Sequence, residues 1–242
     1  MTVSAGLLLL SLAVLGGASA QRVTGLGFAL VASPFLVLLL GPLQGVLLAN
    51  ALSLLSNLVV FAFTWRDVSL RKVLLLSVPA MVMVVPGARV AQHTPAAPLM
   101  VVVGSVTLLA LLTVTLLPRA RVLRGTSGAI TAGGASGFLN AAAGVGGPPV
   151  SLYAVSTGWD QREFVSSAQL YFALVNAASL AAKGVPDIDV PVAMSALTAL
   201  AAGSAAGHWL ARRMPVARAR AAATGLALLG AAAATVKGVV AL

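Results

Sequence analysis

Long apolar runs separated by short polar segments make up most of the 242-residue chain. Several runs hold about 20 residues, the length that an α-helix needs to cross a bilayer. They cover residues 43–63, 73–90, 97–117, 164–182, 190–210 and 216–242. The pattern predicts an all-α polytopic membrane protein.

The remaining apolar runs come in two pairs that are short or interrupted. In the first pair, a run that ends at Ala20 is followed by a break around residues 22–27 and by residues 28–40. In the second pair, residues 127–143 are followed by the sequence GVGGPP and by residues 150–157. Each pair is predicted to form a broken or re-entrant helical hairpin beside three long spans, which gives about eight transmembrane segments.

The GVGGPP sequence does not suit a continuous helix. Pro148 and Pro149 have no backbone N–H, and Gly144, Gly146 and Gly147 accept backbone angles that other residues avoid. Non-helical backbone at membrane depth is tolerated only where it is buried in protein or lines a cavity. Interrupted apolar segments in corresponding positions of two halves therefore point to a transporter's binding site.

The two halves of the chain resemble each other. An offset of 117 residues (133 minus 16) pairs residues 16–19 with residues 133–136, and it also pairs Gly41 with Gly158. We therefore predict one integral membrane domain made of two repeats, residues 1–118 and 126–242, joined by a basic linker at 119–125.

Positive charge is concentrated in short loops. The formal net charge is +10, from 15 Lys and Arg against 5 Asp and Glu. Basic loops of membrane proteins stay on the cytoplasmic side. The loops are marked by Arg66, Arg71 and Lys72, by Arg119, Arg121 and Arg124, and by Arg212, Arg213, Arg218 and Arg220. The topology that follows inverts the second half relative to the first and puts both termini outside the plasma membrane.

Several function classes are disfavoured by what the sequence lacks. It has no cysteine, and His93 and His208 alone do not make a usual metal site. All Asp and Glu fall in predicted loops, which disfavours proton coupling through carboxylates. Enzyme and nucleotide-binding motifs are also missing. We expect no enzyme activity, no cofactor, no metal and no nucleic-acid partner.

The two breaks are predicted to meet near the membrane midplane, where helix N-termini offer N–H groups to an anion. The candidate residues from the breaks are Gly25, Gly27, Ser33, Pro34, Gly144, Gly146, Gly147, Pro148 and Pro149. Arg22 lies in the first break, where it either attracts an anion or extends to the interface.

Polar side chains at helical spacing mark two of the long spans. Asn50 and Asn57 share one face, as do Gln169 and Asn176, and Asn140 precedes the second break. Such amides either line a substrate path or form hydrogen bonds between helices, and both interpretations remain open.

The second break carries a family resemblance. Gly137 and Phe138, followed by residues 144–149, resemble the glycine-rich stretch of the TauE/SafE sulfite exporter family, also called TSUP. The segment from Gly25 to Pro34 and Phe35 is similar to the related turn in the first half of that family. The resemblance implies transport of small anions such as sulfite, organosulfonates or organic acids, and it gives the class of substrate without choosing one.

Together these observations predict a secondary transporter of a small anion in a lipid bilayer, with homo-oligomerisation left open. An anion channel with the same site is one alternative. A membrane scaffold that does not transport is another, and it predicts a break that tolerates mutation.

Overall fold

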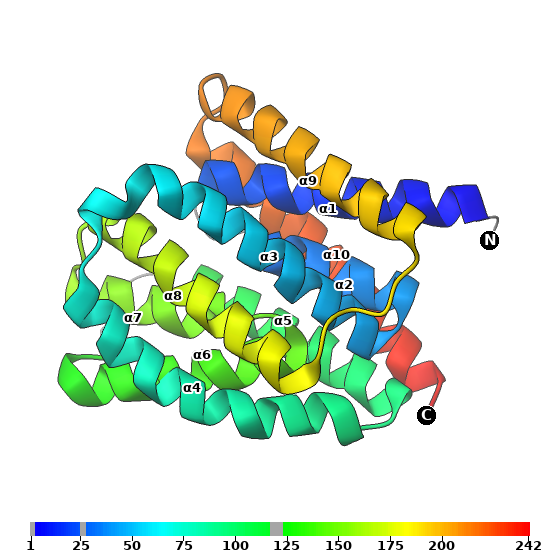
Figure 1. Cartoon of the computed structure of the whole chain (residues 1–242), viewed down its shortest axis with the longest axis horizontal. Coiled ribbons are helices and arrows are strands. Elements are labelled where there is room, and N and C mark those ends of the chain that lie inside the picture. The colour runs from blue at the N-terminus through cyan, green and yellow to red at the C-terminus, as the bar shows by residue number, and fades with distance from the viewer. Residues whose placement is uncertain (1–2, 25–27, 117–122) are drawn as a thin grey trace.

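The computed structural model describes residues 3–24, 28–116 and 123–242 of the chain. This part is a bundle of helices joined by short connections, with no β-strand (Figure 1). The helices are α1 (Val3–Thr24), α2 (Phe28–Leu40), α3 (Pro42–Thr64), the 3-10 turn η1 (Trp65–Asp67), α4 (Leu70–His93), α5 (Ala96–Leu116), α6 (Gly125–Ala143), α7 (Gly147–Thr157), α8 (Gln161–Lys183), α9 (Val190–Ala211) and α10 (Val216–Val240).

Seven of the described helices are long and apolar enough to cross a membrane, namely α1, α3, α4, α5, α8, α9 and α10. The helix α2 is apolar but has 13 residues, and α7 has 11. At a rise of about 1.5 Å per residue, a helix as short as α7 covers about half of a bilayer's hydrocarbon core. The all-α polytopic membrane class is therefore confirmed.

The second hairpin turns at Gly144. This residue ends α6 with a left-handed φ of 74°, which glycine adopts without steric cost. Its N–H donates to the carbonyl of Asn140 at 2.9 Å, and the N–H of Val145 donates to that of Leu139 at 3.4 Å. The predicted break is thus limited to residues 144–146, because α7 begins at Gly147 and its prolines occupy first-turn positions where no N–H is needed.

The first half differs from the sequence-based prediction at two points. The helix α1 continues through Arg22 to Thr24, so Arg22 lies in its last turn and not in a break. Pro34 lies inside α2 and does not end it. Membrane helices tolerate such a proline because neighbouring groups satisfy the carbonyl that loses its donor. Gly25 and Gly27 lie outside the described residues.

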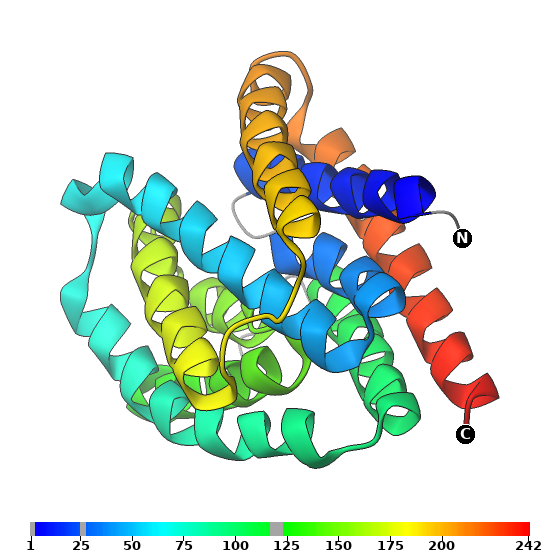
Figure 2. The same cartoon turned by 45° about the vertical axis from the view of Figure 1, so that its right-hand side comes forward.

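The central pair of helices, α3 and α8, runs antiparallel (Figures 1 and 2). At one end the N–H of Asp187 donates to Oε1 of Gln44 at 2.9 Å, and at the other the N–H of Ser69 donates to Oγ of Ser167 at 2.9 Å. These two helices are the third elements, and the first long spans, of the predicted halves. Their opposite directions are those expected of an inverted repeat.

The first helix of each predicted half packs closely against the fourth helix of the other half. In the α1–α9 pair, Gly203 faces the backbone of Leu15. In the α4–α6 pair, Gly133 and Gly137 face the carbonyls of Leu76 and Ala80. A side chain larger than hydrogen at these glycines would collide with backbone, so they serve helix packing.

The start of α1 and the end of α10 lie at the same end of the bundle (Figures 1 and 2). The η1 turn and the α9–α10 connection, which carry Arg66, Arg212 and Arg213, lie at the opposite end. The described ends of the chain therefore lie at one end of the bundle, opposite two of the basic loops. The side of the membrane that each end faces stays a prediction from charge.

Candidate functional site

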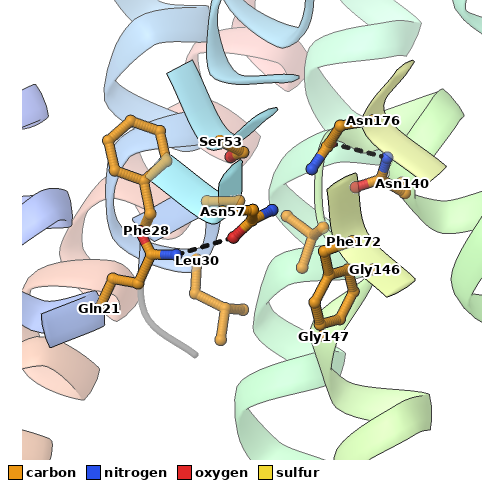
Figure 3. Close-up of a pocket in the computed structure, with 12 residues that line it drawn as sticks. Gln21, Phe28, Leu30, Ser53, Asn57, Asn140, Gly146, Gly147, Phe172 and Asn176 are labelled. Atoms are coloured by element: carbon orange, nitrogen blue, oxygen red, sulfur yellow. Dashed lines mark hydrogen bonds between the residues drawn. The ribbon is translucent and has the colours of Figure 1, made fainter. Parts of the chain in front are cut away.

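A small cavity lies between the two predicted halves (Figure 3). About 50 Å³ of it is accessible to the centre of a water-sized molecule, which is room for a few waters or one small ion. Its lining residues are Gln21, Phe28, Ala29, Leu30, Ser53, Asn57, Asn140, Val145, Gly146, Gly147, Phe172 and Asn176. None of these residues carries a charged side chain.

Eight of the twelve lining residues come in pairs that occupy equivalent places in the two halves. In each pair the second residue lies 119 residues (140 minus 21) after the first. The pairs are Gln21 with Asn140, Phe28 with Gly147, Ser53 with Phe172, and Asn57 with Asn176. The helices α3 and α8 also match at this offset and have 23 residues each. Equivalent residues of two inverted halves meet only near the axis that relates them, which lies in the membrane plane. The cavity is therefore near the midplane if the halves are an inverted repeat.

One hydrogen-bonded amide pair comes from the first half. Nε2 of Gln21 donates to Oδ1 of Asn57 at 2.9 Å, and Oγ of Ser56 donates to Oε1 of Gln21 at 2.7 Å. All three side chains are buried. These bonds hold the carbonyl oxygen of Asn57 toward Gln21 and leave its Nδ2 on the other side.

The matching amide pair comes from the second half. Nδ2 of Asn140 donates to Oδ1 of Asn176 at 3.1 Å and to Oγ of Ser179 at 3.2 Å. Both amide pairs have partners 36 residues apart in the chain. Figure 3 shows the Nδ2 atoms of Asn57 and Asn176 directed toward the space between the two pairs. The cavity thus presents N–H donors from both halves.

The start of α7 adds backbone donors. The N–H groups of Gly146 and Gly147 have no acceptor within the described part of the chain. Pro148 and Pro149, which follow, have no N–H to offer. The carbonyl of Gly146 accepts a hydrogen bond from Oγ of Ser136, which fixes the orientation of the segment. Free N–H groups at a helix N-terminus favour an anion.

The side chains of Ser33 and Asn50, both from the first half, lie beside the break in the second. Oγ of Ser33 donates to the carbonyl of Ala143 at 3.0 Å. Asn50 is completely buried near Gly144, and neither its Nδ2 nor its Oδ1 has a partner among the described residues. Its counterpart at the offset of 119 residues is Gln169, which is also buried and whose Oε1 has no hydrogen-bond partner among the described residues.

The structure brings together five of the predicted site residues in the cavity lining: Asn57, Asn140, Gly146, Gly147 and Asn176. Ser33, Asn50 and Gly144 lie beside the break at the end of α6. The other described candidates do not line this cavity. Pro34 is buried inside α2, Gln169 is buried in α8, Arg22 is half-buried in α1, and Pro148 and Pro149 line a separate apolar cavity.

Sequence reasoning missed Gln21, Phe28 and Phe172. The signal for Gln21 was the repeated spacing of 36 residues between amide side chains, which was hidden because residues 16–19 and 133–136 favoured an offset of 117. The small residues match at an offset of 117, whereas the amides follow the offset of 119 that relates the central helices α3 and α8.

Comparison with known proteins supplies the family. Residues 9–234 match the protein family described as Sulfite exporter TauE/SafE. Comparisons with curated proteins and with solved structures found no match. The family match covers nearly all of the chain, including both amide pairs and the break. The chain therefore belongs to the TauE/SafE family of sulfite-exporter-type membrane transporters.

Proposed function

We propose that the protein is a carrier for a small oxyanion, with sulfite as the first candidate, and that the anion binds in the cavity between Asn57 and Asn176. The observation that carries this proposal is the direction of the hydrogen bonds. Each asparagine uses its Oδ1 to accept a bond from its own half, and each thereby turns its Nδ2 into the shared cavity.

A site of neutral donors suits transport. An anion that binds to amide N–H groups gains hydrogen bonds that are stronger than neutral ones. It leaves without having to separate from a charged side chain in the cavity lining, and transport requires binding that is weak enough for release. The N–H groups of Gly146 and Gly147 add donors from the same side as Asn176.

The position between two halves suits alternating access. Donors come from α3 of the first half and from α7 and α8 of the second. Movement of one half against the other would open the cavity first to one side and then to the other. The cavity volume favours a compact anion over an extended organic acid.

The test is anion uptake by proteoliposomes that contain the purified protein. Sulfite, sulfate, sulfoacetate and chloride are compared with and without a membrane potential. We expect saturable sulfite uptake that is accelerated by sulfite on the opposite side. Uptake that rises linearly with concentration would indicate a channel, and no uptake of any anion would favour the scaffold.

Two substitutions test the site itself. Asn57→Asp and Asn176→Asp keep the oxygen that accepts the bond from Gln21 or Asn140, and they replace the donor that faces the cavity by a carboxylate oxygen, whose charge when ionised repels an anion in addition. Loss of one hydrogen bond to a charged ligand costs about 1.5–3 kcal/mol, so we expect at least a roughly tenfold loss of uptake. Thr198→Val is the control, because Thr198 is exposed on α9 and its hydroxyl bonds only to its own helix. Wild-type uptake by both aspartate variants would overturn the proposed site.

A further inference from the structure

Lys183 is a buried basic residue near the break. It is the last residue of α8, its exposed fraction is 8%, and its Nζ donates to the carbonyl of Ala141 at 2.8 Å. The span predicted at residues 164–182 ends just before Lys183. The structure instead holds its side chain inside the protein, against the last turn of α6.

The ammonium of Lys183 has no acidic partner in the described ranges, where the ion pair present joins Lys72 to Glu163. A buried lysine is ordinarily paired with an opposite charge. Here its partner is the carboxyl end of α6, which carries about half a negative charge because its carbonyls point the same way. The contact therefore neutralises a helix dipole.

Lys183 and the cavity share the same turn of α6. Asn176, Ser179 and Lys183 lie on one face of α8, at spacings of three and four residues. Asn140 bonds to Asn176 and Ser179, and the next residue, Ala141, bonds to Lys183. This turn of α6 therefore contributes the amide of Asn140 to the cavity, and its next residue, Ala141, accepts a hydrogen bond from the ammonium of Lys183.

Two helix ends of opposite sign meet at the break. The carboxyl end of α6 at Ala143 is followed, four residues later, by the amino end of α7 at Gly147. Without compensation, the negative end of α6 would offset the positive end of α7 in the potential that the cavity experiences. Compensation by a fixed cation leaves the amino end of α7 and the amide donors to determine that potential.

We propose that Lys183 is a positioning residue that makes the cavity selective for anions by neutralising the carboxyl end of α6. The inference rests on the proposed function and adds to it the group that sets the charge preference. It also predicts how that preference depends on the charge of the anion, because an electrostatic free energy doubles when the ligand carries two charges instead of one.

The experiment compares Lys183→Gln, which keeps an N–H donor without the charge, with Lys183→Arg, which keeps the charge. Lys237→Gln is the matched control, because Lys237 is exposed and its Nζ donates at 3.0 Å to the carbonyl of Leu38, in the last turn of α2. The readouts are the KM and maximal rate of sulfite uptake, the inhibition constants of chloride and sulfate, and the thermal unfolding temperature in detergent.

Lys183 lies seven positions after Asn176 in α8, which corresponds to about 10 Å along the helix axis. At an effective dielectric constant of about 20, loss of one charge at that distance weakens binding of a monovalent anion roughly tenfold. For Lys183→Gln we expect the inhibition constant of chloride to rise by this factor and that of sulfate by its square, with an unchanged unfolding temperature. For Lys183→Arg we expect both inhibition constants to return to the values of the unmodified protein. Equal factors for the two anions, or wild-type constants, would overturn the inference. Absence of saturable uptake by the unmodified protein would instead overturn the proposed function.

Discussion

Adding the same methyl group at three glycines of the break separates folding from transport. Gly144, Gly146 and Gly147 lie within four residues of one another, yet their surroundings differ. The substitution to alanine is therefore a matched series, in which each member serves as a control for the other two.

Gly144→Ala is expected to destabilise the protein. Its φ of +74° is a left-handed conformation, and an added Cβ would lie 2.9 Å from Oγ of Ser33. The backbone conformation alone costs an alanine about 1–2 kcal/mol. Gly146→Ala has an ordinary φ of −94°, but its Cβ would lie 2.9 Å from Oγ of Ser136 and 3.0 Å from Cβ of Asn140. Such overpacking costs about 1–3 kcal/mol.

Gly147→Ala is expected to cost less stability than the other two substitutions. No heavy atom outside its chain neighbours lies within 4 Å of the added Cβ, and the remaining cost is the contact of that Cβ with the ring of Pro148, which disfavours the helical conformation for the residue before it. Gly147 also lines the cavity. The methyl group therefore enters space that the anion needs. If the bound anion meets an overpacking cost of about 1–3 kcal/mol, KM for sulfite rises about 5- to 150-fold.

Thermal unfolding in detergent and sulfite uptake in proteoliposomes measure the two effects on the same preparations. We expect Gly147→Ala to be the most stable of the three variants and still to be impaired in uptake. A Gly147→Ala protein with the wild-type KM would refute the assignment of this cavity to the substrate.

Three further predictions follow from contacts near the site. Ser33→Ala removes the donor to the buried carbonyl of Ala143 and should lower the free energy of unfolding by about 1–3 kcal/mol. Thermal or chemical unfolding in detergent measures this change, and an unchanged free energy would contradict the role of the bond. Asn50→Leu replaces a buried amide that has no partner among the described residues. It should raise the unfolding temperature measured without substrate and reduce uptake. A lower unfolding temperature would mean that the amide stabilises the fold. The N–H groups of Glu163 and Arg162 donate to the Asp160 side chain, and these bonds lower the pKa of that carboxyl below its ordinary value of 3.8. The ionised Asp160 therefore caps and stabilises α8 at a pH above 3.8. This stabilisation is lost as the pH falls through the lowered pKa. Asp160→Ala should remove this acid-dependent loss of stability, and Asp160→Asn should keep the cap without it, as followed by unfolding at several pH values.

Much of the fold could be predicted from the sequence because membrane-spanning helices are recognisable by their length and apolar composition. The span expected at residues 43–63 is α3 at Pro42–Thr64, and that expected at 190–210 is α9 at Val190–Ala211. The break after Ala143 was also predictable, because few structures other than a helix end require glycine and proline at such density.

The site was only partly predictable, because amide side chains look alike whether they bind a ligand or another helix. Asn57 and Asn176 were identified by helical spacing, but their partners were not: Gln21 lies in an apolar first helix and contacts Asn57 only through the tertiary fold. Arg22 was assigned to a break because glycines follow it, whereas α1 extends one more turn. Pro148 and Pro149 shape the start of α7 without facing the cavity.

The close pairing of α1 with α9 and of α4 with α6 has a consequence for how the protein is made. The ribosome completes α1 long before α9 exists, so the backbone-to-glycine contact between Leu15 and Gly203 closes only when most of the chain has entered the membrane. A fragment that ends at residue 118 has α1 and α4 without these partners, and a fragment that starts at residue 126 has α6 and α9 without theirs. We expect each fragment to be degraded when expressed alone and to be rescued by co-expression of the other, so that assembly of this transporter is a late event in its biogenesis.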